Sequence, residues 1–294
     1  MHPLVERDFP LESLSVHGVM GPPNGMPLVF LHGVTRGWQD YTTFLPPFVE
    51  QYQVFALDHR GHGRSDRSVT GAYLVRDYAA DFVSFLERHL SNPAIVYGHS
   101  LGALVAVVAA ARVPHRVRAL ILEDPPATAL GEAIAESRFL LQFTGTRQLL
   151  DKPSQTVEQL TAGLVELPVR RPGDGAVVRF GDLRDIETLR FAAGCLLQLD
   201  PKTLDPLIAG RWLEGVDWFG ALPRIKCPTL LLQGDPSCGG MLESGEADRL
   251  LAGLANGSRV FLAGVGHSIH YAEPKRTERI VQDFLERHSF RVQN

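Results

Sequence analysis

The sequence predicts an α/β fold built on a mostly parallel sheet. Short apolar runs alternate with amphipathic stretches, as in QVFALD (53–58) followed by LVRDYAADFVSFLERHL (74–90). The first run is apolar enough to be buried on both faces of a sheet, and apolar residues recur in the second at helical spacing. Because helices cross between neighbouring parallel strands, this alternation favours a single layered core.

Further strands are expected at the other short apolar runs. AIVYG (94–98) leads directly into a helix rich in alanine and valine, and KRTERIVQDFLERH near the end of the chain is an amphipathic helix. The remaining expected strands are LESLSVHGV, MPLVFLHG, VRALILED (117–124), PTLLLQG (228–234) and SRVFLAG (258–264).

The alternation stops in the middle of the chain and then resumes. AIAESRFLLQF and DIETLRFAAGCLLQL are typical of helices, RRPGDG is typical of a polar turn, and no strand of the buried kind lies between them. No linker flanks this region. We therefore expect one core domain, formed by residues 1–126 and 218–294, that is interrupted by a helical cap over residues 127–217.

Composition excludes several classes of protein. Of the 294 residues, 45% are hydrophobic and 21% charged, and the net charge of −4 gives no reason to expect a nucleic-acid partner. We expect neither a secretory signal nor a membrane span, because no basic segment with an apolar core begins the chain and no apolar stretch approaches 18 residues. The three widely spaced cysteines fit neither a disulfide framework nor a paired-ligand zinc site. We expect a cytoplasmic protein without metal or other cofactor, as a monomer or homodimer.

Ser100 is the candidate nucleophile. It stands in GHSLG (98–102), a G-x-S-x-G pattern between an expected strand and an expected helix. A sharp strand-to-helix turn forces the serine into a strained backbone conformation, and the glycines let neighbouring chains approach closely. The hydroxyl then stands at the carboxyl edge of the sheet, beside helix amides that stabilise negative charge.

His267 is the candidate base. It follows the last expected strand, in AGVGHSIHYAEP. A serine hydroxyl is a poor nucleophile near neutral pH, and an imidazole can take its proton and later deliver it to the leaving group. His270 competes locally, but it is expected in or near the next helix, so we favour His267.

Four segments together resemble the α/β-hydrolase-fold serine hydrolases, of the lid-bearing esterase and lactonase kind. They are FLHGVTRGW (30–38), DHRGHGRSD (58–66), GHSLGA (98–103) and GVGHSIH (264–270). The resemblance covers nearly the whole chain and implies an eight-stranded, mostly parallel sheet flanked by helices, with the cap inserted after the sixth strand. It matches His267 to the family's histidine and implies an oxyanion hole at the amides of Val34 and Leu101. The loop 58–66 is expected to shape the site without doing chemistry.

The acid that orients the histidine remains open. Such enzymes usually carry it three residues beyond a glycine after the seventh strand, but that position here is Ser237, and Asp235 comes two residues too early. A minority place the acid at the end of the sixth strand, where Glu123 and Asp124 stand. Since an ionised carboxylate at the end of a buried strand needs partners, we favour Glu123 and keep Asp235 and Asp124 as alternatives.

The expected reaction is acyl transfer through an acyl-enzyme that water resolves. Serine argues against dehalogenases and epoxide hydrolases, which resemble this fold but need an aspartate at that position. Aromatic side chains in and beside the cap favour a moderately bulky, uncharged, apolar ester or lactone as the small-molecule partner. A C–C bond hydrolase, a cofactor-free oxygenase and a non-catalytic small-molecule receptor are the alternatives. The residues expected to contact the substrate are Gly33, Trp38, Trp212 and Trp218.

Overall fold

The computed structural model describes residues 4–153 and 155–290, and the described chain forms one main sheet of eight strands. The strands are β1 (Val5–Pro10), β2 (Ser15–Met20), β3 (Pro27–Leu31), β4 (Gln53–Leu57), β5 (Ala94–His99), β6 (Val117–Glu123), β9 (Thr229–Gly234) and β10 (Gly257–Leu262). Their order is β1-β2-β4-β3-β5-β6-β9-β10. β2 runs antiparallel to β1 and β4, and the other neighbouring pairs are parallel. The eight-stranded, mostly parallel sheet is therefore confirmed.

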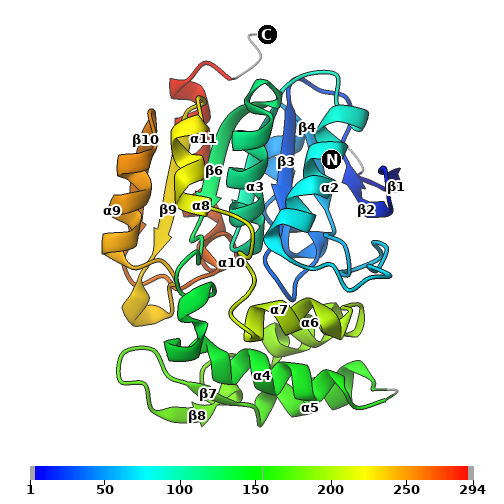
Figure 1. The fold of residues 1–294 in the computed structure, drawn as a ribbon, viewed down its shortest axis with the longest axis vertical. Helices are drawn as coiled ribbons and strands as arrows, with labels where there is room; N and C mark the ends of the chain where they lie inside the picture. The colour runs from blue at the N-terminus through cyan, green and yellow to red at the C-terminus, as the bar shows by residue number, and fades with distance from the viewer. Residues whose placement is uncertain (1–3, 154, 291–294) are drawn as a thin grey trace.

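Each central strand contributes side chains to two hydrophobic clusters, one on each face of the sheet. In β3, Val29 packs into one cluster and its neighbour Leu28 into the other, as the two-residue period of a strand requires. Helices α2 (Val75–His89) and α3 (Leu101–Arg112) cover the first face, and α11 (Pro274–Arg287) covers the second (Figure 1). Burial on both faces explains the mostly apolar sequences of the central strands.

The other helices fall into two groups. Those outside the middle region are α1 (Pro46–Val49), α8 (Trp218–Ala221), α9 (Ser244–Gly253) and α10 (Ile269–Ala272). Those in the middle region are α4 (Phe139–Leu150), α5 (Val157–Val165), α6 (Ile186–Leu197) and α7 (Asp205–Ile208), and they gather at one end of the molecule (Figure 1). None of the helices in the described part of the chain has the length and apolar character needed to cross a bilayer.

The middle region also contains a small hairpin that the sequence analysis did not identify. Strands β7 (Pro168–Arg170) and β8 (Val177–Arg179) pair antiparallel. Most of their residues are exposed, so they lack the buried apolar run that marks the other strands. The RRPGDG segment forms the turn, where Arg171 and Asp174 make an ion pair on the surface.

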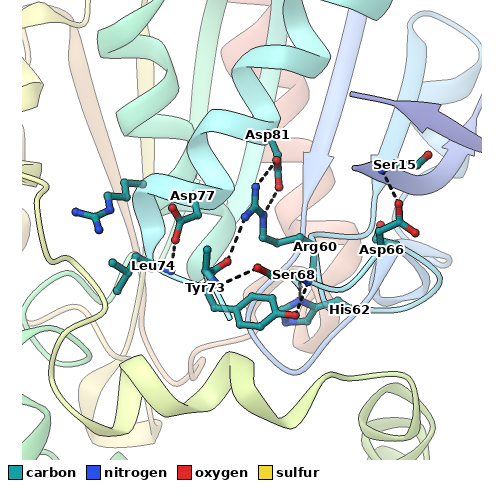
Figure 2. Close-up of polar contacts among 12 residues, drawn as sticks. Ser15, Arg60, His62, Asp66, Ser68, Tyr73, Leu74, Asp77 and Asp81 are labelled. Carbon is teal, nitrogen blue, oxygen red and sulfur yellow. Dashed lines mark hydrogen bonds and ion pairs between the residues drawn. The ribbon is translucent and has the colours of Figure 1, made fainter. Parts of the chain in front are cut away.

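The loop after β4 is held rigidly in place. Two guanidinium nitrogens of Arg60 donate to the carboxylate of Asp81 in α2 at 2.5 and 2.6 Å, as Figure 2 shows. The Ser68 amide donates to the Tyr73 hydroxyl oxygen at 2.8 Å. At the start of the loop, buried Asp58 accepts from the Trp38 amide at 2.8 Å, which ties the loop after β3 to the loop after β4. These contacts fit the structural role expected for this segment.

Candidate active site

Ser100 occupies a strained turn between β5 and α3. Its φ of 54° and ψ of −114° lie in a region that non-glycine residues rarely adopt. A Cβ on Gly102 would stand 2.0 Å from the Leu31 carbonyl oxygen, and one on Gly98 would stand 2.4 Å from the Gly102 carbonyl oxygen. Both positions therefore need glycine for steric reasons, which is the physical content of the G-x-S-x-G pattern.

Two backbone amides beside Ser100 are free to bind an anion. The Ser100 amide donates to the Glu123 carbonyl at 2.9 Å and the Gly102 amide to the His32 carbonyl at 3.2 Å. The amides of Val34 and Leu101, in contrast, have no hydrogen-bond partner within residues 4–153 and 155–290. These are the two amides that the resemblance implies for the oxyanion hole.

The loop that carries Val34 runs directly past the serine. A Cβ on Gly33 would stand 3.0 Å from His99 Nδ1 and 3.1 Å from the Ser100 Cβ, so the absence of a side chain relieves a tight contact here. Burial lowers the pKa of His32 well below its usual value, which keeps the ring neutral. Its Nδ1 then donates to the Gly33 carbonyl at 2.7 Å, and its Nε2 accepts from the His59 amide at 3.1 Å. His32 thereby holds the loop that carries Val34 in place.

His267 pairs with Asp124. The His267 Nδ1 lies 2.6 Å from Asp124 Oδ2, and the aspartate side chain is fully buried. Asp124 also accepts from the Gly234 amide at 3.0 Å and from the Met241 amide at 2.7 Å. Three donors therefore surround the carboxylate, which is what a buried anion requires.

Glu123 does not contact His267, contrary to the preference drawn from the sequence. Its carboxylate accepts from the Tyr97 hydroxyl at 2.7 Å and from the His270 amide at 2.9 Å, and it lies 2.7 Å from His270 Nδ1. The reason is geometric. Glu123 keeps the strand alternation and faces the cluster beneath the sheet, whereas Asp124 has a φ of 45° that turns the chain out of β6.

The carboxylate of Asp235, the second alternative, accepts hydrogen bonds within its own loop and from a neighbouring one. Its Oδ1 accepts from the amide and the hydroxyl of Ser237, at 2.9 and 2.6 Å. Its Oδ2 accepts from the Gly264 amide at 2.9 Å. This carboxylate therefore joins the loop after β9 to the loop after β10.

A buried ion cluster lies behind the His267–Asp124 pair. Burial opposes charge on His270, but the Glu123 carboxylate and Asp40 raise the pKa of His270 to about 10. Burial also opposes charge on Glu123, but the charge of His270 and the hydrogen bonds from His270 and Tyr97 outweigh it and lower the pKa of Glu123 to about 2. His270 Nε2 lies 3.4 Å from Asp40 Oδ2, so a buried imidazolium stands between two carboxylates.

His99 connects this cluster to His267. Burial lowers the pKa of His99 to about 4, so its ring is neutral. Its ring centroid lies 4.6 Å from that of His267 and 5.1 Å from that of His270. Its Nε2 lies 3.1 Å from the His267 carbonyl oxygen, which holds the backbone of the candidate base. In the described chain the Ser100 hydroxyl itself forms no hydrogen bond.

Of the four residues expected to contact the substrate, two lie in the segment between β3 and β4 and two are buried in the core. Gly33 passes close to Ser100, and partly buried Trp38 lies further along that segment. Trp212 and Trp218 are 0% and 3% exposed. Trp218 donates from its indole to the Leu104 carbonyl in α3, so both of these tryptophans are packing residues of the core and are not carried into the site. Among the described residues, no group of three or more His, Cys, Asp or Glu side chains could hold a metal ion.

The sequence is similar to those of several known hydrolases. Over 101 residues the chain is 36% identical to 2-(acetamidomethylene)succinate hydrolase of Mesorhizobium japonicum, a match that spans 34% of this chain and 36% of that protein. Over 90% of this chain and 92% of the relative, it is 25% identical to epoxide hydrolase A of Mycobacterium tuberculosis. The chain spans just over a third of the first relative's length.

Solved structures agree at the level of the fold. The enol-lactonase of Burkholderia xenovorans superposes with a TM-score of 0.74 over 95% of this chain and all of that chain, at 17% identity. An E-2-(acetamidomethylene)succinate hydrolase superposes with a TM-score of 0.73 over 97% of this chain and all of its own, at 20% identity. A family model of the alpha/beta hydrolase fold matches residues 26–274. The chain therefore belongs to the α/β hydrolase fold family.

Proposed function

We propose that the protein is a serine hydrolase that cleaves a carboxylic ester or lactone through an acyl-enzyme intermediate. The observation that carries the proposal is the strained Ser100 flanked by the unpartnered amides of Val34 and Leu101. The His267–Asp124 pair at the same edge of the sheet supports it. The relatives named above include hydrolases and an enol-lactonase, which supports hydrolysis of an acyl bond.

In this mechanism the Ser100 hydroxyl attacks the substrate carbonyl. His267 takes the proton at Nε2, because its Nδ1 is bonded to Asp124. The oxyanion accepts hydrogen bonds from the amides of Val34 and Leu101, each worth about 10²–10³ in rate. The leaving oxygen then takes the proton back from His267. Water, activated by the same imidazole, releases the acid and restores the serine.

Asp124 is the acid in this proposal, in place of Glu123. Its carboxylate holds the imidazole in the tautomer that leaves Nε2 free to accept a proton, and it stabilises the imidazolium that forms. The amides of Gly234, at the end of β9, and of Met241, in the loop after it, hold the carboxylate in place. An acid at the end of β6 thus replaces the one more commonly found after β9. Serine at the elbow, where epoxide hydrolases need an aspartate, argues against epoxide opening despite the relative of that name.

The proposal is tested by trapping the serine and measuring turnover. We expect a fluorophosphonate probe to label wild-type protein at Ser100, and a graded set of p-nitrophenyl esters and lactones to include substrates. Ser100→Ala should lose both labelling and turnover, with an unchanged melting temperature as evidence of folding. Absence of turnover across the whole set, or oxygen consumption without ester cleavage, would contradict the proposal.

A further inference from the structure

A small cavity lies where the middle helices meet the loop that carries Val34. Thr35 and Arg36 line it from that loop, and side chains of α4, α5 and α6 line it from the other side together with Arg184. Its volume is about 50 Å³. A single water needs about 10–15 Å³ of such space, so the cavity holds a group the size of a carboxylate and excludes a bulky acyl chain.

The polar lining of this cavity consists of hydrogen-bond donors without any acid. Arg36 and Arg184 bring guanidinium groups, Gln142 an amide, and three threonines line the wall, of which Thr188 already donates its hydroxyl to Asp185. Apolar side chains such as Phe143 and Leu189 fill the rest of the wall. A donor-rich, partly apolar enclosure is complementary to an anion with several acceptor atoms.

The charge of Arg36 is incompletely satisfied. Its Nη1 is buried and has no hydrogen-bond partner among the described residues. Its nearest acid is Asp40, at 3.9 Å from Nε, and Asp40 also faces the imidazolium of His270 at 3.4 Å. The guanidinium carbon stands 5.8 Å from the centre of the Phe191 ring, which holds the side chain over α6.

Arg184 faces the same cavity without an ion pair in the part of the chain that the structure describes. Its Nη1 donates to the adjacent Leu183 carbonyl at 2.9 Å. Its neighbour Asp185 directs both carboxylate oxygens to the amide and hydroxyl of Thr188, at 2.8 and 2.9 Å. Arg184 is exposed to solvent on one side, and partial desolvation together with the positive charge of Arg36 lowers its pKa. Two cations therefore share a cavity that contains no anion of its own.

We propose that Arg36 and Arg184 form a subsite for a free carboxylate on the substrate. This proposal rests on the hydrolysis at Ser100 proposed above. It adds that the preferred ester or lactone carries a negative charge. This differs from the uncharged substrate expected from the sequence. Arg36 is two residues from Val34, so their Cα atoms are at most about 7 Å apart, and a series of spacer lengths in the ligand tests the reach from the guanidinium to the carbonyl under attack.

Binding to the inactive Ser100→Ala protein tests the subsite without turnover. The ligands are matched pairs, the monomethyl and dimethyl esters of succinate, glutarate and adipate, titrated by calorimetry. We expect at least one monomethyl ester, which carries the carboxylate, to bind about 10–100-fold tighter than its neutral dimethyl partner. Adding Arg184→Gln should remove most of that preference, and Arg184→Lys should restore only part of it, because lysine keeps the charge and loses the bidentate geometry.

Arg190→Gln is the matched control. Arg190 lies on the exposed side of α6, where it pairs with Glu158 at 3.2 Å, so its loss should leave the preference for the monomethyl ester intact. Equal binding of both esters in every pair, or an equal loss of preference in Arg190→Gln, would overturn the subsite. Melting temperatures of all variants show whether they are folded.

Kinetics on the active protein separate the two proposals. If monomethyl esters bind preferentially but no ester or lactone is hydrolysed, the proposed reaction fails and the subsite stands. If both esters are hydrolysed with equal kcat/KM and bind equally, the reaction stands and the subsite fails. We expect kcat/KM to favour the monomethyl ester, and the ratio to fall about 10–100-fold in Arg184→Gln.

Discussion

Glu123 and Asp124 are chemically similar neighbours whose surroundings differ completely. The Glu123 side chain packs in an aromatic cluster, where it contacts Tyr97 and the charged His270. Asp124 leaves the strand with a positive φ and meets His267. One backbone torsion therefore decides which carboxylate can orient the base and which belongs to the ion cluster.

At this scale we expect Asp124→Asn to lower kcat about 10²–10⁴-fold with a small change in KM. An amide in place of the carboxylate no longer stabilises the imidazolium and favours the wrong tautomer of His267. Steady-state kinetics on the best ester from the screen, with circular dichroism to confirm folding, measure the effect.

Asp235→Asn is the control for this experiment. Asp235 supports only a turn between two loops, so its variant should keep its turnover within about tenfold of wild type. Loss of activity in Asp235→Asn together with full activity in Asp124→Asn would move the acid to the loop after β9.

At the scale of the element, the turn from β5 to α3 depends on close backbone contacts. The carbonyls of Leu31 and Gly102 occupy the space where side chains at Gly102 and Gly98 would begin. Neither neighbour is a flexible side chain, so neither can move without distorting β3 or α3. The strain at Ser100 is thus held by the packing of two elements rather than by local propensity.

We expect Gly102→Ala to lower the free energy of unfolding by at least about 3 kcal/mol, because its Cβ would overlap a backbone oxygen. Gly194→Ala offers the opposite case on α6, where nothing lies within 4 Å of the added Cβ. A helix-interior glycine replaced by alanine without a clash should raise stability by about 0.5–1 kcal/mol. Urea denaturation of both variants tests the pair, and equal effects would contradict the steric argument.

At the scale of the whole molecule, the buried ions join segments that are distant in the chain. Glu123 ends β6, His270 lies in α10 after β10, and Asp40 lies in the segment between β3 and β4. Removing one member of such a cluster leaves an uncompensated buried charge and costs about 3–5 kcal/mol. The cluster also couples folding to pH.

We expect this cluster to stabilise the protein most between about pH 4.5 and 6.5. The pKa of Glu123 is lowered from 4.5 to about 2, so its contribution is present above pH 4.5 and is lost as the pH falls through about 2. The pKa of His270 is raised from 6.5 to about 10, so its contribution is present below pH 6.5 and is lost as the pH rises through about 10. Urea denaturation at a series of pH values between about 2 and 10 measures how the free energy of unfolding depends on pH.

The double variant Glu123→Gln/His270→Gln removes both titrations and serves as the comparison. Its free energy of unfolding should be lower than that of wild type at pH 5.5 and should vary less with pH. If the pH profiles of the two proteins run parallel, the cluster does not govern the pH dependence.

Much of the core could be predicted from sequence because buried parallel strands have a strong local signature. The runs at β3, β4, β5, β6 and β9 are mostly apolar, and the structure has a strand at each. β1 and the β7–β8 hairpin were missed because their residues are mostly exposed and carry no such run. The packing roles of Trp212 and Trp218 were missed because composition does not say which aromatic residues line a pocket.

The fold family and the candidates Ser100 and His267 could be predicted from sequence alone, since each is tied to a short motif with its own steric or chemical logic. The acid that contacts His267 became clear only from the folded chain, because it depends on the backbone torsion at Asp124 and on amide donors that are distant in the sequence. Only the folded chain brings Arg36 and Arg184 to one cavity. Contacts between distant segments leave no local periodicity, so no pattern in the chain reports them.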